Sequence, residues 1–269
     1  MNPLAEKYPG VNSYVYCMDN PVRLIDPDGR FPILINGRVS KDSERGSRTY
    51  WDKSIRETIK ARTGYYHSQF MYVDGDRGKL PSTRINAGMA QGKADAAKIY
   101  ARLKASIKDG KITEQLQAFS HSRGSAFANG YMQGVSAEVI KMAEKDNVGF
   151  AYGKANIFEY SVNLAPHQSN WINYGKGTGA TNINISHVGD PFSGNDATGN
   201  VINVQSIPEH DADPITQHGN GFFNTELNLV LKILEGGGGN VETHVKSGYL
   251  IYDQNRKNGD KSKVTNGSN

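Results

Sequence analysis

The segment 117–128 carries the side chains best placed for chemistry. It reads QAFSHSRGSAFA, so an apolar run is followed by a turn of small residues and then by a helical pattern. A serine at the apex of a strand–turn–helix has its hydroxyl lifted clear of the sheet, as in a nucleophile elbow. Ser122 occupies that apex, and Ser120 and Gly124 are the small residues on either side. The pattern predicts Ser122 as a nucleophile; the alternative is an ordinary turn with a serine cap.

A histidine must assist this serine, because a serine hydroxyl is inert at neutral pH without a base. His218 is the preferred candidate, since it lies in the segment TQHGNG just before the last predicted helix. His121 adjoins the serine in sequence, but in an elbow its side chain points away, so we do not expect it to be the base. His210 and His244 remain alternatives.

An acid is needed to orient the histidine and to stabilise its charged form. Asp190 follows a predicted strand at 182–188 and precedes a proline, which places it at the carboxyl end of a late strand. Asp190 is therefore the predicted third member, although the Asp-Pro step is also explained by a simple turn. Asp211 and Asp213 are the alternatives.

Two backbone amides are expected to stabilise the oxyanion that forms during attack on a carbonyl. The first is the N–H of Arg123, the residue after the proposed nucleophile, at the beginning of a helix. The second is expected from the loop after the first strand, where Gly37 allows close approach of the backbone to a substrate. A glycine that simply ends a strand is the ordinary interpretation of Gly37.

The surrounding sequence predicts the elements that position these residues. Strands are expected over 31–36, 67–73, 114–119, 157–164, 182–188, 201–204 and 249–252, helices over 49–62, 93–107, 125–145 and 225–234, and a loop over 77–90. Strands alternate with helices through 31–190, which predicts an α/β fold with a mostly parallel sheet and helices on both faces. The loops after residues 36, 74, 119 and 188 should then share one rim, where ligands bind in such sheets.

Composition sets wider limits on function. The chain has 269 residues, of which 37% are hydrophobic and 22% charged, and a formal net charge of +4. Its single cysteine, Cys17, excludes an internal disulfide and a cysteine-based zinc site. The basic residues are dispersed, so nucleic-acid binding is not expected. No cofactor or metal is predicted, and neither a long apolar run nor a signal peptide is present.

Residues 2–30, NPLAEKYPGVNSYVYCMDNPVRLIDPDGR, resemble the end of the conserved core of Rhs/YD-repeat proteins. In that family a large β-shell encloses a variable C-terminal toxin, and the chain is often cut just after a Pro-x4-Asp-Pro-x-Gly-Leu motif. Pro21, Asp26, Pro27 and Gly29 match that motif, whereas Arg30 stands where the family has leucine. The resemblance implies a short Rhs-core remnant at 1–30 and a separate effector domain after it.

Residues 31–235 resemble an α/β-hydrolase of the lipase type, similar to the class 3 lipases and to lipase-like toxins found behind Rhs cores. The likeness rests on Ser122, on the Gly189-Asp190-Pro191 step and on His218-Gly219, in the order that such hydrolases use. We therefore expect an α/β-hydrolase-like domain over 31–252, followed by a disordered polar tail at 253–269.

The expected function is a serine ester hydrolase, a lipase, phospholipase or esterase, that acts as an antibacterial-type toxin. The expected partners are a lipid or other ester substrate, a cognate immunity protein and an Rhs shell, with transient contact to a membrane surface. The protein is expected to be made in the cytoplasm and secreted or delivered without its own signal peptide. The alternatives are a metal-dependent nuclease, for which 210–213 is the only clustered candidate, and an inactive binding module on a hydrolase fold.

Overall fold

A six-stranded sheet forms the centre of the molecule in the computed structural model, which describes residues 31–64, 69–175, 179–188, 190–206 and 213–235. Its strands are β1 (Phe31–Asn36), β2 (Met71–Asp74), β5 (Leu116–His121), β7 (Phe158–Leu164), β9 (Thr181–His187) and β11 (Val201–Ser206). They are arranged in the order β11-β9-β7-β5-β1-β2, and every neighbouring pair is parallel. The predicted α/β class with a mostly parallel sheet is confirmed.

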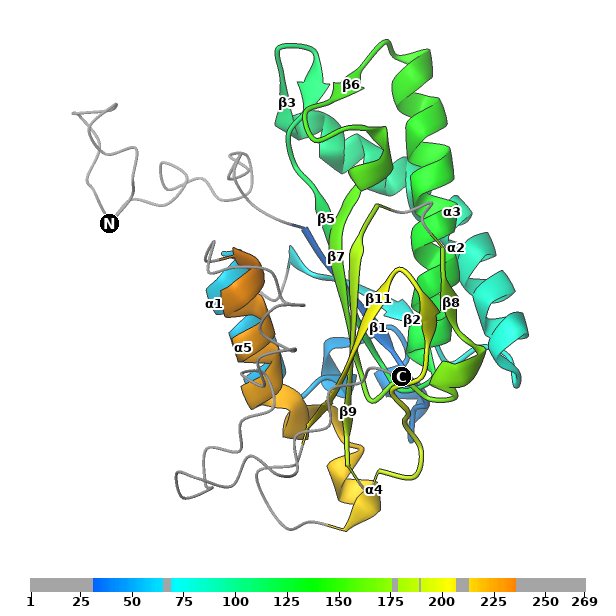
Figure 1. The fold of residues 1–269 in the computed structure, drawn as a ribbon. Coiled ribbons are helices and arrows are strands. Elements are labelled where there is room, and N and C mark those ends of the chain that lie inside the picture. The colour runs from blue at the N-terminus through cyan, green and yellow to red at the C-terminus, as the bar shows by residue number, and fades with distance from the viewer. Residues whose placement is uncertain (1–30, 65–68, 176–178, 189, 207–212, 236–269) are drawn as a thin grey trace, which may run out of the picture.

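Helices cover both faces of the sheet (Figure 1). One face carries α2 (Pro81–Leu103) and α3 (Gly124–Lys145), and the other carries α1 (Lys53–Thr63) and α5 (Asn224–Glu235). Short elements fill the connections: α4 (Pro214–Gln217), the 3-10 helices η3 (Asp42–Glu44), η4 (Arg48–Tyr50), η6 (Lys104–Ser106), η7 (Lys154–Asn156), η8 (Ser169–Trp171) and η10 (Asn220–Phe223), and the two-residue strands β3 (Ile107–Lys108), β4 (Lys111–Ile112), β6 (Gly149–Phe150), β8 (Asn173–Tyr174) and β10 (Thr198–Gly199).

Each sheet face has its own apolar core. Ile33, Ile35 and Ala118 pack toward α2 and α3, whereas Leu34 and Phe119 pack toward α1 and α5. The alternation follows from the pleat, which sends successive side chains to opposite faces. Among the described residues, no helix combines the length and apolar character needed to cross a bilayer.

Helix α2 begins earlier than the sequence pattern predicts. Residues 77–90 were expected to form a loop, but the helix starts at Pro81, which occupies a first-turn position that proline tolerates. Gly88 made the segment look unfavourable for a helix. A Cβ at Gly88 would lie 2.0 Å from the Phe127 carbonyl oxygen on α3, so glycine is required by close helix packing.

A ladder of polar side chains crosses the sheet beneath α3. Ser120, Asn163, Asn184 and Asn203 are register partners on β5, β7, β9 and β11. Ser120 Oγ donates to Asn163 Oδ1 at 2.6 Å, and the amides of Asn163 and Asn184 each donate to the next asparagine at 3.0 and 3.1 Å. Because buried polar groups are costly unless paired, this ladder favours one strand register.

Several predictions fall outside the described residues. The Rhs-like segment 1–30, with Pro21, Asp26, Pro27 and Gly29 of the processing motif, is among them. The predicted strand at 249–252 and the tail at 253–269 are also outside.

Candidate active site

Ser122 lies in a left-handed turn between β5 and α3. Its φ is +54°, a conformation that a residue with a Cβ rarely adopts and that is commonly found at functional sites. The Ser122 N–H donates to the Leu164 carbonyl of β7 at 2.9 Å, and the Ser125 N–H donates to the Ser122 carbonyl at 3.1 Å. The strand on one side and the helix on the other thus hold the turn.

Around this turn, neighbouring backbone segments approach so closely that no side chain fits at Gly124 or Gly37. A Cβ on Gly124 would lie 2.6 Å from the Asn36 carbonyl oxygen of β1. A Cβ on Gly37 would lie 2.8 Å from Ser122 Cβ and 2.5 Å from the His121 carbonyl oxygen. The loop after β1 therefore passes directly beside the serine, as the expected position of Gly37 requires.

The structure brings Ser122, His218 and Asp190 together in one chain of hydrogen bonds. Ser122 Oγ lies 2.8 Å from His218 Nε2, and His218 Nδ1 lies 2.7 Å from Asp190 Oδ2. The three side chains come from the turn after β5, the loop after β9 and the segment after α4. Since all these strands are parallel, their carboxyl ends meet on one rim of the sheet.

Asp190 is positioned as a carboxylate that accepts three hydrogen bonds. Besides His218, the Phe192 N–H donates to Oδ1 at 2.8 Å and Ser193 Oγ donates to Oδ2 at 2.7 Å. Burial disfavours the charged carboxylate, but these three hydrogen bonds outweigh it and hold the Asp190 pKa below its ordinary value. The ionised Asp190 accepts the Nδ1 proton, which leaves His218 Nε2 free to accept the Ser122 hydroxyl.

Two backbone N–H groups near Ser122 have no hydrogen-bond partner within the described part of the chain. They belong to Arg123, at the N-terminus of α3, and to Arg38, in the loop after β1. The sequence suggested Gly37, one residue before Arg38, as the second oxyanion donor, and the Gly37 backbone passes beside Ser122. The loop after β1 thus offers the amides of Gly37 and Arg38 as candidates for that donor.

His121 does not contact the Ser122 hydroxyl. Its Nδ1 lies 2.5 Å from the Tyr50 hydroxyl and its Nε2 lies 2.6 Å from the His218 carbonyl oxygen. Burial, together with the nearby His218, lowers the His121 pKa to about 3. His121 is therefore a neutral side chain that links two loops.

Two more histidines, His167 and His187, form hydrogen bonds with the segments that carry the site residues. The His167 N–H donates to the Ser122 carbonyl at 3.2 Å, and its ring Nδ1 donates to the Phe192 carbonyl at 2.8 Å. His187 is buried, stacks on the Phe223 ring at 3.9 Å and donates from Nδ1 to the Gln217 carbonyl at 3.1 Å. Sequence reasoning missed both roles. The only available signal was that each histidine follows or ends a predicted strand.

The alternative residues are less favourably placed or lie outside the described residues. Asp213 is exposed, and it accepts hydrogen bonds from the Ile215 and Thr216 amides as a cap of α4. His210, Asp211 and His244 are not described. Within the described ranges, no three His, Cys, Asp or Glu side chains gather as metal ligands would.

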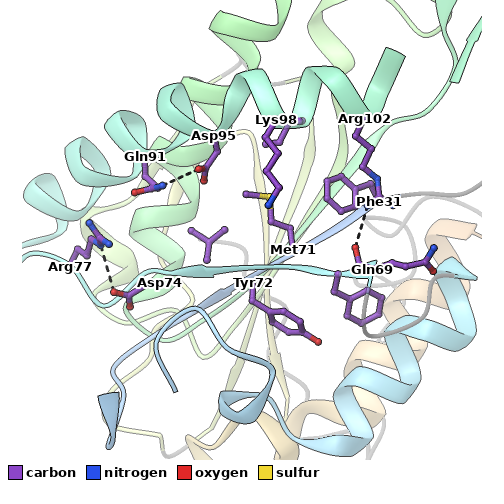
Figure 2. A pocket seen from close by; sticks show the side chains of 13 residues that line it. Phe31, Gln69, Met71, Tyr72, Asp74, Arg77, Gln91, Asp95, Lys98 and Arg102 are labelled. Atoms are coloured by element: carbon purple, nitrogen blue, oxygen red, sulfur yellow. Dashed lines mark hydrogen bonds and ion pairs between the residues drawn. The ribbon is translucent and has the colours of Figure 1, made fainter. Parts of the chain in front are cut away.

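A hollow of about 630 Å³ lies apart from this site, between α2 and the edge strand β2 (Figure 2). Met71, Val73 and Ile99 contribute apolar lining, and the Arg102 guanidinium stacks over the Phe31 ring at 3.7 Å. Ser122, Asp190 and His218 are not among the lining residues. The three candidate residues therefore lie on the rim of the sheet and not in this hollow.

No protein-family model matches this chain, and no curated protein is significantly similar to it. The function proposed below accordingly rests on the chemistry of the described residues.

Proposed function

We propose that this protein is a serine ester hydrolase of the lipase type, built on an α/β-hydrolase-like fold. The observation that carries the proposal is the hydrogen-bonded chain Ser122–His218–Asp190 at a left-handed strand–helix turn. A serine, a neutral histidine and a carboxylate in this order can activate the hydroxyl for attack on a carbonyl.

The proposed reaction proceeds in two halves. Ser122 Oγ attacks the ester carbonyl while His218 Nε2 takes its proton, and Asp190 stabilises the resulting imidazolium. The tetrahedral oxyanion is stabilised by the Arg123 N–H and a second amide of the loop after β1. His218 then protonates the leaving alcohol, which gives the acyl-enzyme. A water, deprotonated by His218, attacks that ester, and the acid leaves as Ser122 regains its proton.

The distribution of exposed apolar side chains supports a lipid ester as substrate. Five large hydrophobic residues are exposed in the described part of the chain: Leu80, Trp171, Val188, Phe192 and Ile215. Each lies in a segment that follows the carboxyl end of a strand of the main sheet. Contiguous exposed apolar patches commonly mark an interaction surface. We propose that these five residues, here called the apolar rim, meet a substrate presented by a lipid surface.

One of these side chains lies beside the base. The Phe192 ring packs edge-on against the His218 imidazole, with centroids 5.4 Å apart. The backbone of Ile215 is also close, because its carbonyl accepts the His218 N–H at 3.2 Å. An acyl chain or a lipid tail that reaches Ser122 would thus meet the Phe192 ring beside the base.

The proposed biological role is that of an antibacterial-type effector with an immunity partner. It rests on the resemblance of residues 2–30 to an Rhs core and on no described residue. Hydrolysis of a rival cell's phospholipids is the activity that would join this role to the proposed site.

The decisive test is hydrolysis of p-nitrophenyl esters of graded chain length by the full chain, beside Ser122→Ala and the matched control Ser82→Ala on the exposed first turn of α2. We expect turnover by the parent and by the control, and none above background by Ser122→Ala. A fluorophosphonate should label the parent at Ser122 only. Absence of both turnover and labelling would contradict the proposal, and nucleic-acid cleavage abolished by EDTA would instead support the nuclease alternative.

A further inference from the structure

The two ring nitrogens of His121 have fixed and different roles. Nε2 faces the His218 carbonyl oxygen at 2.6 Å, and a carbonyl can only accept, so Nε2 carries the proton. Nδ1 is then an acceptor, and the Tyr50 hydroxyl, 2.5 Å away, must donate to it. Burial raises the pKa of that hydroxyl, so Tyr50 keeps the proton that it donates.

Tyr50 is itself held by the loops on either side of the site. Its hydroxyl lies close to the loop after β1, since a Cβ on Gly37 would be 3.0 Å from the hydroxyl oxygen. Its carbonyl accepts the Asn220 side-chain amide at 3.1 Å, and Asn220 Oδ1 accepts the Asp52 N–H at 2.8 Å. Asn220 lies two residues after His218. The segment around Tyr50 is therefore joined to the segment that carries His218 by two hydrogen bonds of Asn220.

These contacts leave His121 with no free nitrogen for proton transfer. One nitrogen donates to a backbone carbonyl and the other accepts from a phenol, so neither is available to a substrate. The two histidine rings have centroids 5.2 Å apart. Because His218 must become an imidazolium during attack, a neutral neighbour at that distance is favourable and a charged one is not.

We propose that Tyr50 and His121 form a positioning pair, which ties the elbow to the segment that carries His218 and so sets the approach of His218 Nε2 to Ser122 Oγ. The inference rests on the proposed function of Ser122 and His218 as nucleophile and base. Tyr50 and His121 act through His218 and touch neither the substrate nor the reacting atoms.

The test uses three variants of the full chain: Tyr50→Phe, His121→Leu and His121→Gln. Loss of the pair misplaces His218, and misplacement of a catalytic group by about 1 Å can cost on the order of 100-fold in rate. We expect kcat of Tyr50→Phe and His121→Leu to fall at least tenfold, with KM unchanged. Glutamine offers one donor and one acceptor at similar positions, so His121→Gln should keep most of the parental kcat.

Unchanged kcat in Tyr50→Phe, or an effect on KM alone, would overturn the proposal. A second outcome would also overturn the proposal: kcat of His121→Gln falls as far as that of His121→Leu, while circular dichroism shows that both variants are folded. The hydrogen bonds of His121 would then not be the cause of the loss.

Nitrogen-15 NMR of the histidine rings tests the pairing without any activity. We expect His121 to appear as the neutral Nε2–H tautomer and to remain so from pH 8 to about pH 5, because its pKa lies near 3. An Nδ1–H tautomer would refute the pairing. A parent that neither hydrolyses esters nor reacts with a fluorophosphonate, yet shows this tautomer, would instead refute the proposed function.

Discussion

Asp190 determines which proton His218 can exchange. Its carboxylate accepts the Nδ1 proton at 2.7 Å, and two further donors keep it ionised. The lone pair of His218 Nε2 therefore faces the Ser122 hydroxyl. At this scale the proposed function depends on the negative charge of the Asp190 carboxylate.

Replacing Asp190 with asparagine should remove that control while preserving size. The asparagine amide can donate to Nδ1, which would favour the tautomer whose Nε2 already carries a proton. We expect kcat for p-nitrophenyl esters to fall by about 10³- to 10⁴-fold, the size of effect found for such a change in serine proteases. A fall of less than tenfold would show that Asp190 does not orient the base.

His121 should make folding stability depend on pH. An unfolded histidine titrates at about 6.5, whereas burial lowers the His121 pKa to about 3 in the folded protein. Between these values the unfolded chain binds a proton that the folded chain does not, so stability falls as pH falls through this window. The slope from one such group is at most about 1.4 kcal/mol per pH unit.

The measurement is the free energy of unfolding by urea at pH 7 and pH 5. The parent should lose more stability over this range than His121→Gln, which has no titrating group at this position. Equal losses in the two proteins would contradict the low pKa of His121.

The site residues divide into those that sequence could reveal and those that it could not. Ser122, Asp190 and His218 were predicted because each stands in a local pattern, such as a small-residue turn or the end of a strand. Tyr50 was not predicted, because it contacts His121 across 71 residues of sequence. The sequence pattern places Tyr50 within a helix predicted over 49–62, whereas it ends the 3-10 helix η4, and nothing in the pattern distinguishes it from a core residue.

At the scale of elements, α2 and α3 pack through glycines on both helices. A Cβ on Gly92 would lie 2.3 Å from the Tyr131 carbonyl oxygen, and one on Gly130 would lie 1.9 Å from the Ile85 carbonyl oxygen. Backbone therefore meets backbone along this contact. Since α3 begins at the elbow, the packing of α2 helps to fix the direction in which the nucleophile points.

Gly130→Ala should destabilise the protein, although alanine is the better helix former. In an open helix the change would add about 1 kcal/mol of stability. Here the new Cβ would overlap the Ile85 carbonyl oxygen, and overpacking of this kind costs about 1–3 kcal/mol. The measurement is the urea midpoint of unfolding.

The matched control is Ala94→Gly on the exposed face of α2, which should lose about 1 kcal/mol through helix propensity alone. If Gly130→Ala instead gains stability, the two helices do not approach as closely as described.

Gly88, which belongs to the same helix contact, explains why the start of α2 was missed. A pattern-based prediction treats glycine as a helix breaker, and 77–90 was accordingly assigned to a loop. The strands that fall within the described residues and the other main helices were predicted within a few residues, because their apolar periodicity is local. The sequence pattern could not show that α3 packs against this part of α2, where the close contact makes glycine favourable.

At the scale of the whole molecule, the proposed function predicts that the apolar rim contacts lipid. Trp171 is 70% exposed on that rim, whereas the other tryptophan, Trp51, is 2% exposed. If the rim contacts lipid, Trp171 should enter a less polar environment. We expect its fluorescence emission to shift to shorter wavelength when phosphatidylglycerol–phosphatidylcholine vesicles are added.

Trp171→Phe retains only Trp51 and should show no shift, which assigns the signal to the rim. Absence of a shift in the parent, at vesicle concentrations where ester hydrolysis is measured, would indicate that the rim does not meet a lipid surface.

The strand order has a consequence for synthesis of the protein. From β5 onward each new strand joins the edge left by the previous one, in the order β5, β7, β9, β11. The sheet can therefore widen in one direction as the chain leaves the ribosome. Ser122 leaves the ribosome 96 residues before His218, and Asn220, whose side-chain amide donates to the Tyr50 carbonyl, follows two residues later. A nascent chain therefore carries Ser122 before His218 is available to it, so under the proposed function the chain would be inactive until translation has passed His218.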